Sequence, residues 1–367
     1  MSEIVRLARI GIRAFDLPLA RPLRVGGKTI DRRTGLLVVA EDGEGHAGIG
    51  EAAPLPGLHR ESLAEATGQL FVLAGALAGA AIPAGCPALD GAFEGWLGGR
   101  GLLPSVRTGI EGAVLALLAD RAGCGVPRLL SPAAASRIRV NALLDGPPEA
   151  LLAAAARFAA AGYAALKVKV GRRDPRDEAR LVAQIRAAVG PGIALRLDAN
   201  RAWEFAQALD FAERVAPVGV EYLEEPLRDP ADLPAFAARA RVAVALDETL
   251  LAFEPQAPPR LAGVAALILK PSVLGGYERA MVWARVARRE RLAAVVSAAF
   301  PSAVGLALDA ALAAAIDDGT AHGLGTAGLL AADLIRAPLA DASGAIDTAA
   351  LPFRPADFDL GSTRVLR

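Results

Sequence analysis

Lysine is rare in this chain, and two of its four lysines stand two residues apart in one apolar segment. Of the 40 basic residues 36 are arginine, and the lysines are Lys28, Lys167, Lys169 and Lys270. Lys167 and Lys169 lie in "AALKVKVG" (164–171), a segment typical of a buried strand, where a period of two puts both on one face. A lysine can lose its proton when burial or a neighbouring cation lowers its pKa, whereas an arginine cannot. The pattern therefore indicates amine chemistry.

Acidic residues end the apolar segments that follow. Asp198 ends "LRLD", Glu224 lies in "YLEEP" and Asp247 lies in "LDET", while Lys270 ends "LILK". The four positions are 26, 23 and 23 residues apart, about one strand and one helix each. In a parallel barrel such strand ends meet at one rim, where barrel enzymes keep their active sites. Three converging carboxylates need a cation, and a site of this kind suits Mg²⁺.

Acidic residues at strand ends can also cap the following helices. That alternative explains one such residue well, but three in succession followed by a lysine favour a metal site. A bound metal stabilises the enediolate that forms when a proton leaves the carbon next to a carboxylate, and a nearby amine can take that proton. The residues therefore predict proton abstraction from a small-molecule carboxylate substrate.

Apolar segments alternate with amphipathic helical segments from about residue 137 onward. The expected strands are 138–143, 165–170, 194–198, 220–224, 242–247, 265–270, 293–297 and one near His322. Eight strands alternating with helices predict a (β/α)8-type barrel, although a doubly wound open sheet has the same local pattern. The N-terminal part of the chain differs, with a hairpin signature at 42–45 and helical segments at 61–81 and 105–123. It predicts a small α+β domain.

Composition excludes several other classes of protein. A net charge of +0 and a sequence pI near 6.9 argue against a nucleic-acid partner. Cys86 and Cys124, the only cysteines, are too few for a disulfide framework. The longest apolar run, 70–82, is shorter than the ~20 residues of a membrane helix, and the N-terminal segment lacks a signal-peptide core. We expect a cytoplasmic protein without a membrane partner.

Seven phrases together resemble the enolase superfamily and, within it, the o-succinylbenzoate synthases of menaquinone synthesis. They are "DRRTGLLVV", "GIGEAAPLPG", "LKVKVG", "RLDANRAW", "YLEEP", "LDET" and "LKPSVLGG". The resemblance covers essentially the whole chain. It implies an α/β fold, a modified (β/α)7β TIM-type barrel at 106–330. An α+β capping domain is expected at 1–105, with the tail 331–367 folding back on it.

The resemblance also implies roles for eight residues. The Mg²⁺ ligands are Asp198, Glu224 and Asp247, the catalytic lysines are Lys169, Lys270 and Lys167, and the substrate contacts are Asn200 and Ser297. The implied reaction is the Mg²⁺-dependent loss of water from 2-succinyl-6-hydroxy-2,4-cyclohexadiene-1-carboxylate, which gives 2-succinylbenzoate. Lys169 would remove the α-proton and then protonate the departing hydroxyl, and Lys270 would stabilise the enediolate. We expect Lys167 to help Lys169 lose its proton.

Racemases of N-acylamino acids use the same two lysines, so this activity stays open beside epimerases and cycloisomerases. "HGLGTAG" (322–328) lacks the Asp-x-Asp pair that dipeptide epimerases share, which counts against that activity. "SAAFPSAVG" (297–305) departs from the family pattern, because Pro301 stands where a serine-rich run often holds an acidic residue. The substrate contacts at this place are therefore open.

Three further interpretations have little support. Residues 323–328 match GxGxxG, but too few residues follow to build the unit that a nucleotide-binding dehydrogenase needs, so a glycine-rich loop at the barrel mouth is favoured. A non-catalytic binding protein would not need the complete set of carboxylates and lysines. None of the three histidines stands at a strand end with a metal-ligand partner, which argues against histidine-based catalysis and a Ser-His-Asp triad. Finally, the segment 22–33 is expected to be a loop that closes over the site.

Overall fold

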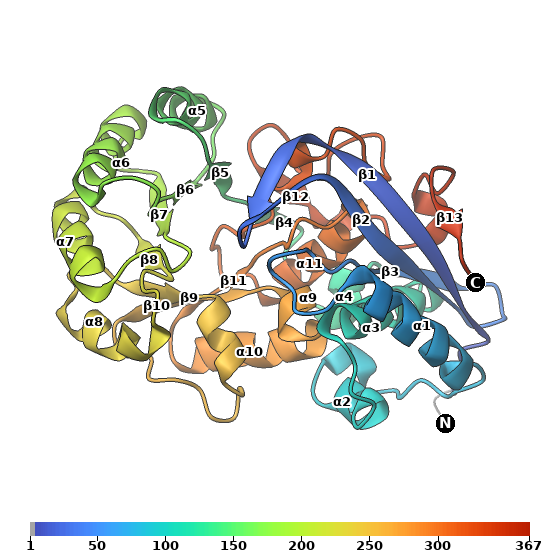
Figure 1. Ribbon diagram of the computed structural model, residues 1–367. Coiled ribbons are helices and arrows are strands. Elements are labelled where there is room, and N and C mark those ends of the chain that lie inside the picture. Colours follow the sequence, from blue (N-terminus) through green and yellow to red (C-terminus); the bar gives the residue numbers. More distant parts are fainter. Residues whose placement is uncertain (1–3) are drawn as a thin grey trace.

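Two sheets organise the chain, a parallel one of seven strands and an antiparallel one of four. The structure is a computed structural model that describes residues 4–367. In Figure 1 the parallel strands and their helices form one side of the molecule, and the antiparallel sheet with both chain ends forms the other. The predicted fold, an α/β barrel with an α+β cap, is confirmed.

The parallel sheet has the order β11-β10-β9-β8-β7-β6-β5. Its strands are β5 (Ala142–Leu144), β6 (Ala165–Lys169), β7 (Ala194–Asp198), β8 (Tyr222–Glu224), β9 (Val244–Leu246), β10 (Val264–Leu269) and β11 (Ala293–Val296). Single parallel bridges from His322 to Val140 and from Gly323 to Ser297 join the two edges. The eighth strand expected near His322 is thus reduced to these bridges, which close the barrel.

Helices surround this sheet, as the alternating sequence pattern predicts. They are α5 (Pro148–Ala160), α6 (Pro175–Val189), α7 (Phe205–Val215), α8 (Leu233–Arg239), α9 (Pro271–Leu274), α10 (Tyr277–Arg289) and α11 (Ala303–Ile316). Within the described chain, the connection from β9 to β10 has only a 3₁₀ turn, Glu248–Ala252. The single strand expected at 138–143 is two strands, β5 and β4 (Arg137–Arg139), and β4 pairs instead with β12 (Ala345–Asp347).

The antiparallel sheet has the order β13-β1-β2-β3 and forms the cap. Its strands are β1 (Arg9–Val25), β2 (Lys28–Glu41), β3 (Ala47–Ala52) and β13 (Arg364–Val365), and its helices are α1 (Leu63–Leu77), α2 (Ala92–Leu97), α3 (Pro104–Arg121) and α4 (Val126–Leu130). α3 packs closely on β3. A side-chain carbon at Gly50 would lie only 2.2 Å from the carbonyl oxygen of Gly109, so there is no room for a side chain at this position. The domain boundary expected at 105 falls inside α3 and stays a prediction.

The segment 22–33 is a β-hairpin and not the loop expected from the sequence. Gly26 and Gly27, with φ of 52° and 77°, form its turn, and positive φ at both central residues suits the twist of two paired strands. The backbone carbonyl of Gly57 lies where a side chain at Gly26 would stand, at 2.2 Å. The hairpin tip extends from the cap toward the barrel (Figure 1). None of the helices among residues 4–367 is long and apolar enough to span a membrane.

Candidate active site

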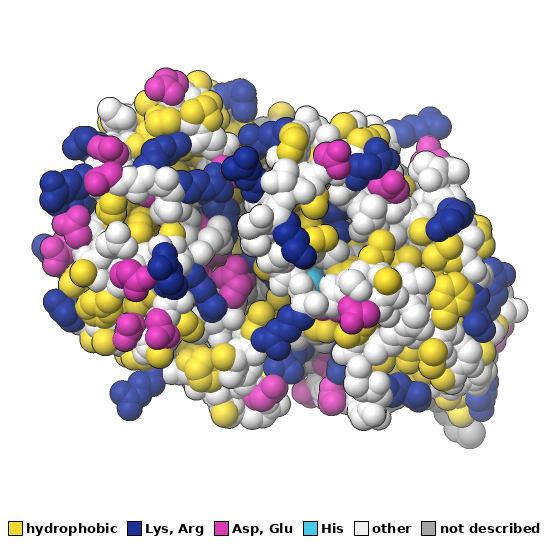
Figure 2. Space-filling model, in the orientation of Figure 1, with side chains coloured by type: hydrophobic (Ala, Val, Ile, Leu, Met, Phe, Trp, Pro, Cys, Tyr) yellow, Lys and Arg dark blue, Asp and Glu magenta, His cyan; other side chains and the backbone are white. Residues whose placement is uncertain are grey.

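A cavity of about 790 Å³ lies between the cap and the carboxyl ends of the barrel strands. The hairpin contributes residues 21–26 to its wall, and the loop after β3 contributes Leu55, Gly57 and Leu58. The barrel contributes the polar groups of Lys169 and Lys270. Figure 2 shows this face of the molecule hollowed at its middle, with charged side chains in the hollow. The cap side of the cavity is mainly apolar but includes Arg21 and Arg24, and the barrel side holds both lysines.

The three barrel lysines follow from their strands. Lys169 is the last residue of β6, and Lys270 comes directly after β10, so both reach the carboxyl rim. Lys167, two residues before Lys169 on the same face, is only 8% exposed and lies deeper in the barrel. β7, β8 and β9 stand between β6 and β10 in the sheet, so Lys169 and Lys270 enter the cavity from separate sides.

Each predicted metal ligand hydrogen-bonds to a lysine. The Asp198 Oδ2 atom accepts from Lys167 at 2.8 Å and from Lys169 at 2.7 Å. Lys167 also donates to Glu224 Oε1 at 2.6 Å, and Lys270 donates to Asp247 Oδ2. These contacts join Lys167, Lys169, Asp198 and Glu224 in one group and Lys270 with Asp247 in a second.

Burial and charge shift the pKa values of Glu224, Asp198 and Lys167. Burial raises the pKa of the Glu224 carboxyl well above its ordinary value, and the neighbouring charges of Asp198 and Asp247 add to the rise. Burial would also raise the pKa of Asp198, but Lys167 and Lys169 hold it well below its usual range. Burial disfavours the charged form of Lys167, yet Asp198 and Glu224 outweigh it and raise its pKa. Lys167 is therefore held as an ammonium ion.

The donor set fits a hard divalent cation, although the side chains are not arranged as its ligands. Among residues 4–367 no three His, Cys, Asp or Glu side chains are gathered around one metal position. However, the Oε2 atom of Glu224 is buried with no hydrogen-bond partner in the described chain. A buried oxygen of this kind normally has a partner, and oxygen atoms of several carboxylates are the ligands that Mg²⁺ takes. Asp198, Glu224 and Asp247 would hold the ion.

The two predicted substrate contacts differ in their placement. Asn200 lines the cavity, and its Oδ1 atom accepts a hydrogen bond of 2.8 Å from Lys169. It has the left-handed backbone that asparagine tolerates, with φ of 45°. Ser297 is buried against Gly323 and is not among the residues that line the cavity. The three residues after it, 298–300, line the cavity instead, and a substrate role for Ser297 stays a prediction.

Glu225 is a residue of this site to which sequence reasoning gave no role. Its carboxylate accepts from the backbone N–H groups of Asp247 (2.8 Å) and Thr249 (2.7 Å) and from the Arg201 guanidinium (2.9 Å). It therefore fixes the strand end that carries Asp247. The two adjacent acids in "LEEP" are a sequence signal for this role. Adjacent strand residues point to opposite sides, so only one of the two can face the metal site and the other is free to hold the backbone.

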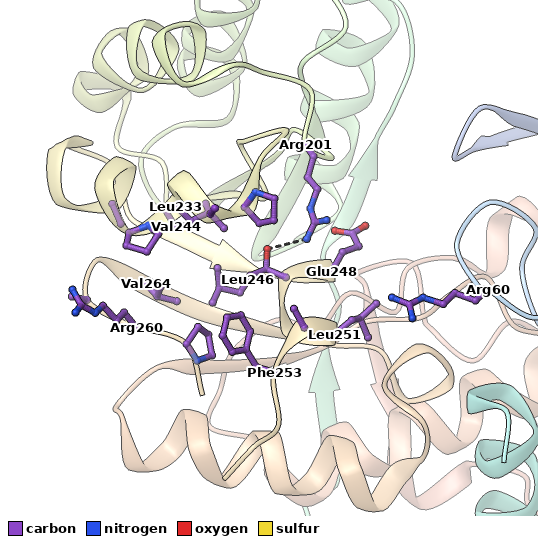
Figure 3. A pocket seen from close by; sticks show the side chains of 18 residues that line it. Arg60, Arg201, Leu233, Val244, Leu246, Glu248, Leu251, Phe253, Arg260 and Val264 are labelled. Carbon is purple, nitrogen blue, oxygen red and sulfur yellow. Dashed lines mark hydrogen bonds between the residues drawn. The ribbon is translucent and has the colours of Figure 1, made fainter. Parts of the chain in front are cut away.

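A second cavity of about 580 Å³ lies between α8, β9 and β10, where the connection between the strands lacks a helix. Its walls are mainly apolar, and Figure 3 shows Leu233, Val244 and Leu246 around it. Arg201 donates a hydrogen bond of 3.0 Å to Thr249, and both residues line this cavity. Glu248 borders both cavities. None of the three barrel lysines lines this one, so the chemistry belongs to the first cavity.

Known proteins resemble this chain in both sequence and fold. The family description "Enolase C-terminal domain-like" matches residues 150–352, and "MenC, N-terminal domain" matches residues 8–85. The chain belongs to the enolase superfamily. Within it, the match to o-succinylbenzoate synthase of Citrobacter koseri is 32% identical over 329 residues, 88% of this chain and 92% of that protein. The family expected from the motifs is confirmed.

Other relatives widen the comparison. The protein PHYLLO of Arabidopsis thaliana is 34% identical over 340 residues, which are 83% of this chain and only 20% of that protein. The muconate lactonizing enzyme of Pseudomonas fluorescens has the same fold, with a TM-score of 0.83 over 99% of this chain and 100% of that one at 19% identity. The L-Ala-D/L-Glu epimerase of Bacillus subtilis matches with a TM-score of 0.81 over 95% and 97%, at 22% identity. This superfamily member is thus an enzyme on a fold that serves several reactions.

Proposed function

We propose that this enzyme is an o-succinylbenzoate synthase, a lyase of menaquinone synthesis that acts in the cytoplasm. Its reaction is the loss of water from 2-succinyl-6-hydroxy-2,4-cyclohexadiene-1-carboxylate to give 2-succinylbenzoate. The observation that carries the proposal is the placement of Lys169 and Lys270 on separate sides of one cavity, above three carboxylates. The relationship to o-succinylbenzoate synthases over 88% of the chain supports the choice of substrate.

Lys169 is the proposed base. As a neutral amine it takes the proton from the ring carbon that bears the carboxylate, and the C–O bond to the hydroxyl group breaks. The same Lys169 ammonium returns its proton to the departing hydroxyl, so that water leaves and the ring becomes aromatic. Asn200, which accepts a hydrogen bond from Lys169, holds the amine in place. The Nζ atom of Lys169 thus first accepts the proton and then donates it.

Lys270 and the carboxylates supply charge. Burial opposes the charged form of Lys270, but Asp247 and Glu248 outweigh it and raise its pKa, so this side chain is a cation opposite the base. A cation there stabilises the negative charge that develops on the substrate carboxylate. When bound, Mg²⁺ held by Asp198, Glu224 and Asp247 would supply further positive charge for that carboxylate.

Racemisation of an N-acylamino acid is the second candidate function. It is favoured by the same placement, because two lysines on separate sides of a carbon atom can remove a proton from one face and return it to the other. For this reaction Lys270 must also act as a base. We rank dehydration first because of the similarity to o-succinylbenzoate synthase over 88% of this chain.

Parallel assays of the two reactions test the proposal. The purified enzyme with Mg²⁺ is given the cyclohexadiene carboxylate, and 2-succinylbenzoate is followed by its aromatic absorbance. A separate sample is given an N-succinylamino acid, and its optical rotation is followed. We expect rapid formation of the aromatic product and little racemisation. Racemisation without dehydration would favour the second candidate. An enzyme that shows neither activity would contradict both candidate functions.

A further inference from the structure

The loop between β11 and α11 holds a strained aromatic residue at the substrate cavity. Phe300, which lines the cavity together with Ala298 and Ala299, has a left-handed backbone with φ of 54°. A bulky side chain without glycine's freedom rarely adopts this conformation, and such residues persist only where their surroundings hold them. The next residue in the chain is Pro301, which restricts the backbone of the residue before it.

Arg33 of the cap holds this residue by its carbonyl group. The side chain of Arg33 is almost completely buried, and its Nε atom donates to the carbonyl oxygen of Phe300 at 2.7 Å. The other guanidinium donors go to the carbonyl oxygens of Thr34 (2.8 Å), Pro54 (3.3 Å) and Ala53. The planar guanidinium thereby joins the loop after β3 to the loop after β11. Both of these loops border the cavity.

Glu51 of the cap fixes the other end of the same loop. Its carboxylate accepts from the backbone N–H groups of Ser302 at 3.0 Å and Gly305 at 3.2 Å, and from the hydroxyl group of Ser302. These groups form the first turn of α11, where a negative charge is favourable. The residues before and after Pro301 are therefore both held by charges that belong to the cap.

We propose that Arg33 is a positioning residue that holds Phe300 in its left-handed conformation as a wall of the substrate cavity. The wall would pack against the flat apolar ring of the substrate, while the barrel lysines act on its carboxylate side. Phe300 is thus a specificity-determining residue for planar ring carboxylates, and Arg33 acts through it. The identity of the ligand rests on the proposed function, whereas the hold of Arg33 on Phe300 does not.

Substitutions at the two positions test the ligand part. In Phe300→Gly and Arg33→Lys we expect KM, and the Kd of 2-succinylbenzoate measured by calorimetry, to rise roughly tenfold while kcat changes far less. Arg13→Lys is the matched control, because Arg13 also donates to a backbone carbonyl, that of Leu360 (3.0 Å), but lines neither cavity. Its KM should equal that of the wild type. Unchanged KM and Kd in both test variants would overturn the role in binding.

A double-mutant cycle tests the hold on Phe300 without any ligand. Glycine adopts the left-handed backbone freely, so Arg33→Lys should lower the melting temperature less in a Phe300→Gly background than in the wild type. Phe300→Gly should also melt above Phe300→Ala, because only alanine keeps the strain. Equal losses in both backgrounds would overturn the positioning role. A wild type that neither binds nor forms 2-succinylbenzoate would overturn the proposed function and leave the result of this cycle standing.

Discussion

Two regions of this enzyme bury charge and use it differently. The barrel-rim cluster consists of three lysines and three carboxylates at the ends of β6–β10, and each cation there contacts a carboxylate. The cap–barrel seam consists of Arg33 and Glu51 with the loop before α11, and its charges contact mainly backbone groups. Side chains that pair with side chains can exchange partners when a ligand binds. Charges that bind backbone groups fix the conformation of the chain. We therefore assign catalysis to the barrel-rim cluster and the shape of the cavity wall to the cap–barrel seam.

The two regions also differ in how far apart their partners lie in the sequence. Lys169 and Asp198 are 29 residues apart, about one strand and one helix, whereas Arg33 and Phe300 are 267 apart. The regular repeat of a barrel made the rim predictable, since strand ends recur at a fixed interval. Arg33 lies in "DRRTGLLVV", a phrase that resembles the family, but nothing in that phrase gives it a partner, and no repeat connects it to the loop that it holds.

Local chemistry explains the other differences between sequence and structure. The hairpin at 22–33 was missed because two adjacent glycines suggested a flexible loop, whereas both take the positive φ of a tight turn. The helix expected between β9 and β10 is absent from the described chain, and "PQAPPR" (255–260) explains this, since three prolines remove donors that a helix needs. The strand at 138–143 divides because β4 pairs with β12, which comes from the far end of the chain.

The largest effect should come from removing one charge at the rim. Glu224→Gln keeps the shape of a fully buried side chain but removes the negative charge from a proposed metal ligand and weakens the hydrogen bond from Lys167. We expect kcat to fall on the order of 10²–10³-fold, and the rise in melting temperature on adding Mg²⁺ to be lost. Glu221→Gln is the control, because Glu221 precedes the same strand and pairs with Arg196. Equal kcat values for the two variants would refute the role of the rim.

The next effect is a pH dependence of stability that belongs to the seam. Burial raises the pKa of Glu51 to about 7, against an opposing effect of Arg33. Because the folded pKa exceeds the unfolded value, the contribution to stability is complete below the unfolded pKa and is lost as the pH rises through about 7. Between pH 5 and pH 8 the wild type should lose on the order of 2 kcal/mol that Glu51→Gln does not lose. Urea unfolding at both pH values measures this, and parallel pH profiles would contradict it.

The smallest effect should come from the hydroxyl group of Ser302. Ser302→Ala removes one hydrogen bond to Glu51 but keeps the backbone N–H groups that Glu51 also contacts. We expect a loss of about 1 kcal/mol in the free energy of unfolding and no change in kcat. A loss of kcat in this variant would mean that the seam takes part in the chemistry, so that the division between the two regions would no longer hold.

The central claim is that the rim acts through an amine at position 169, and Lys169→Arg tests it most directly. Arginine keeps the positive charge beside Asp198 but cannot serve as a base. Aminoethylation of Lys169→Cys with 2-bromoethylamine restores an amine at the same place, with the treated wild type, which has Cys86 and Cys124, as control. We predict that Lys169→Arg folds and forms no measurable 2-succinylbenzoate, and that the aminoethylated variant regains activity. Substantial turnover by Lys169→Arg would contradict the account.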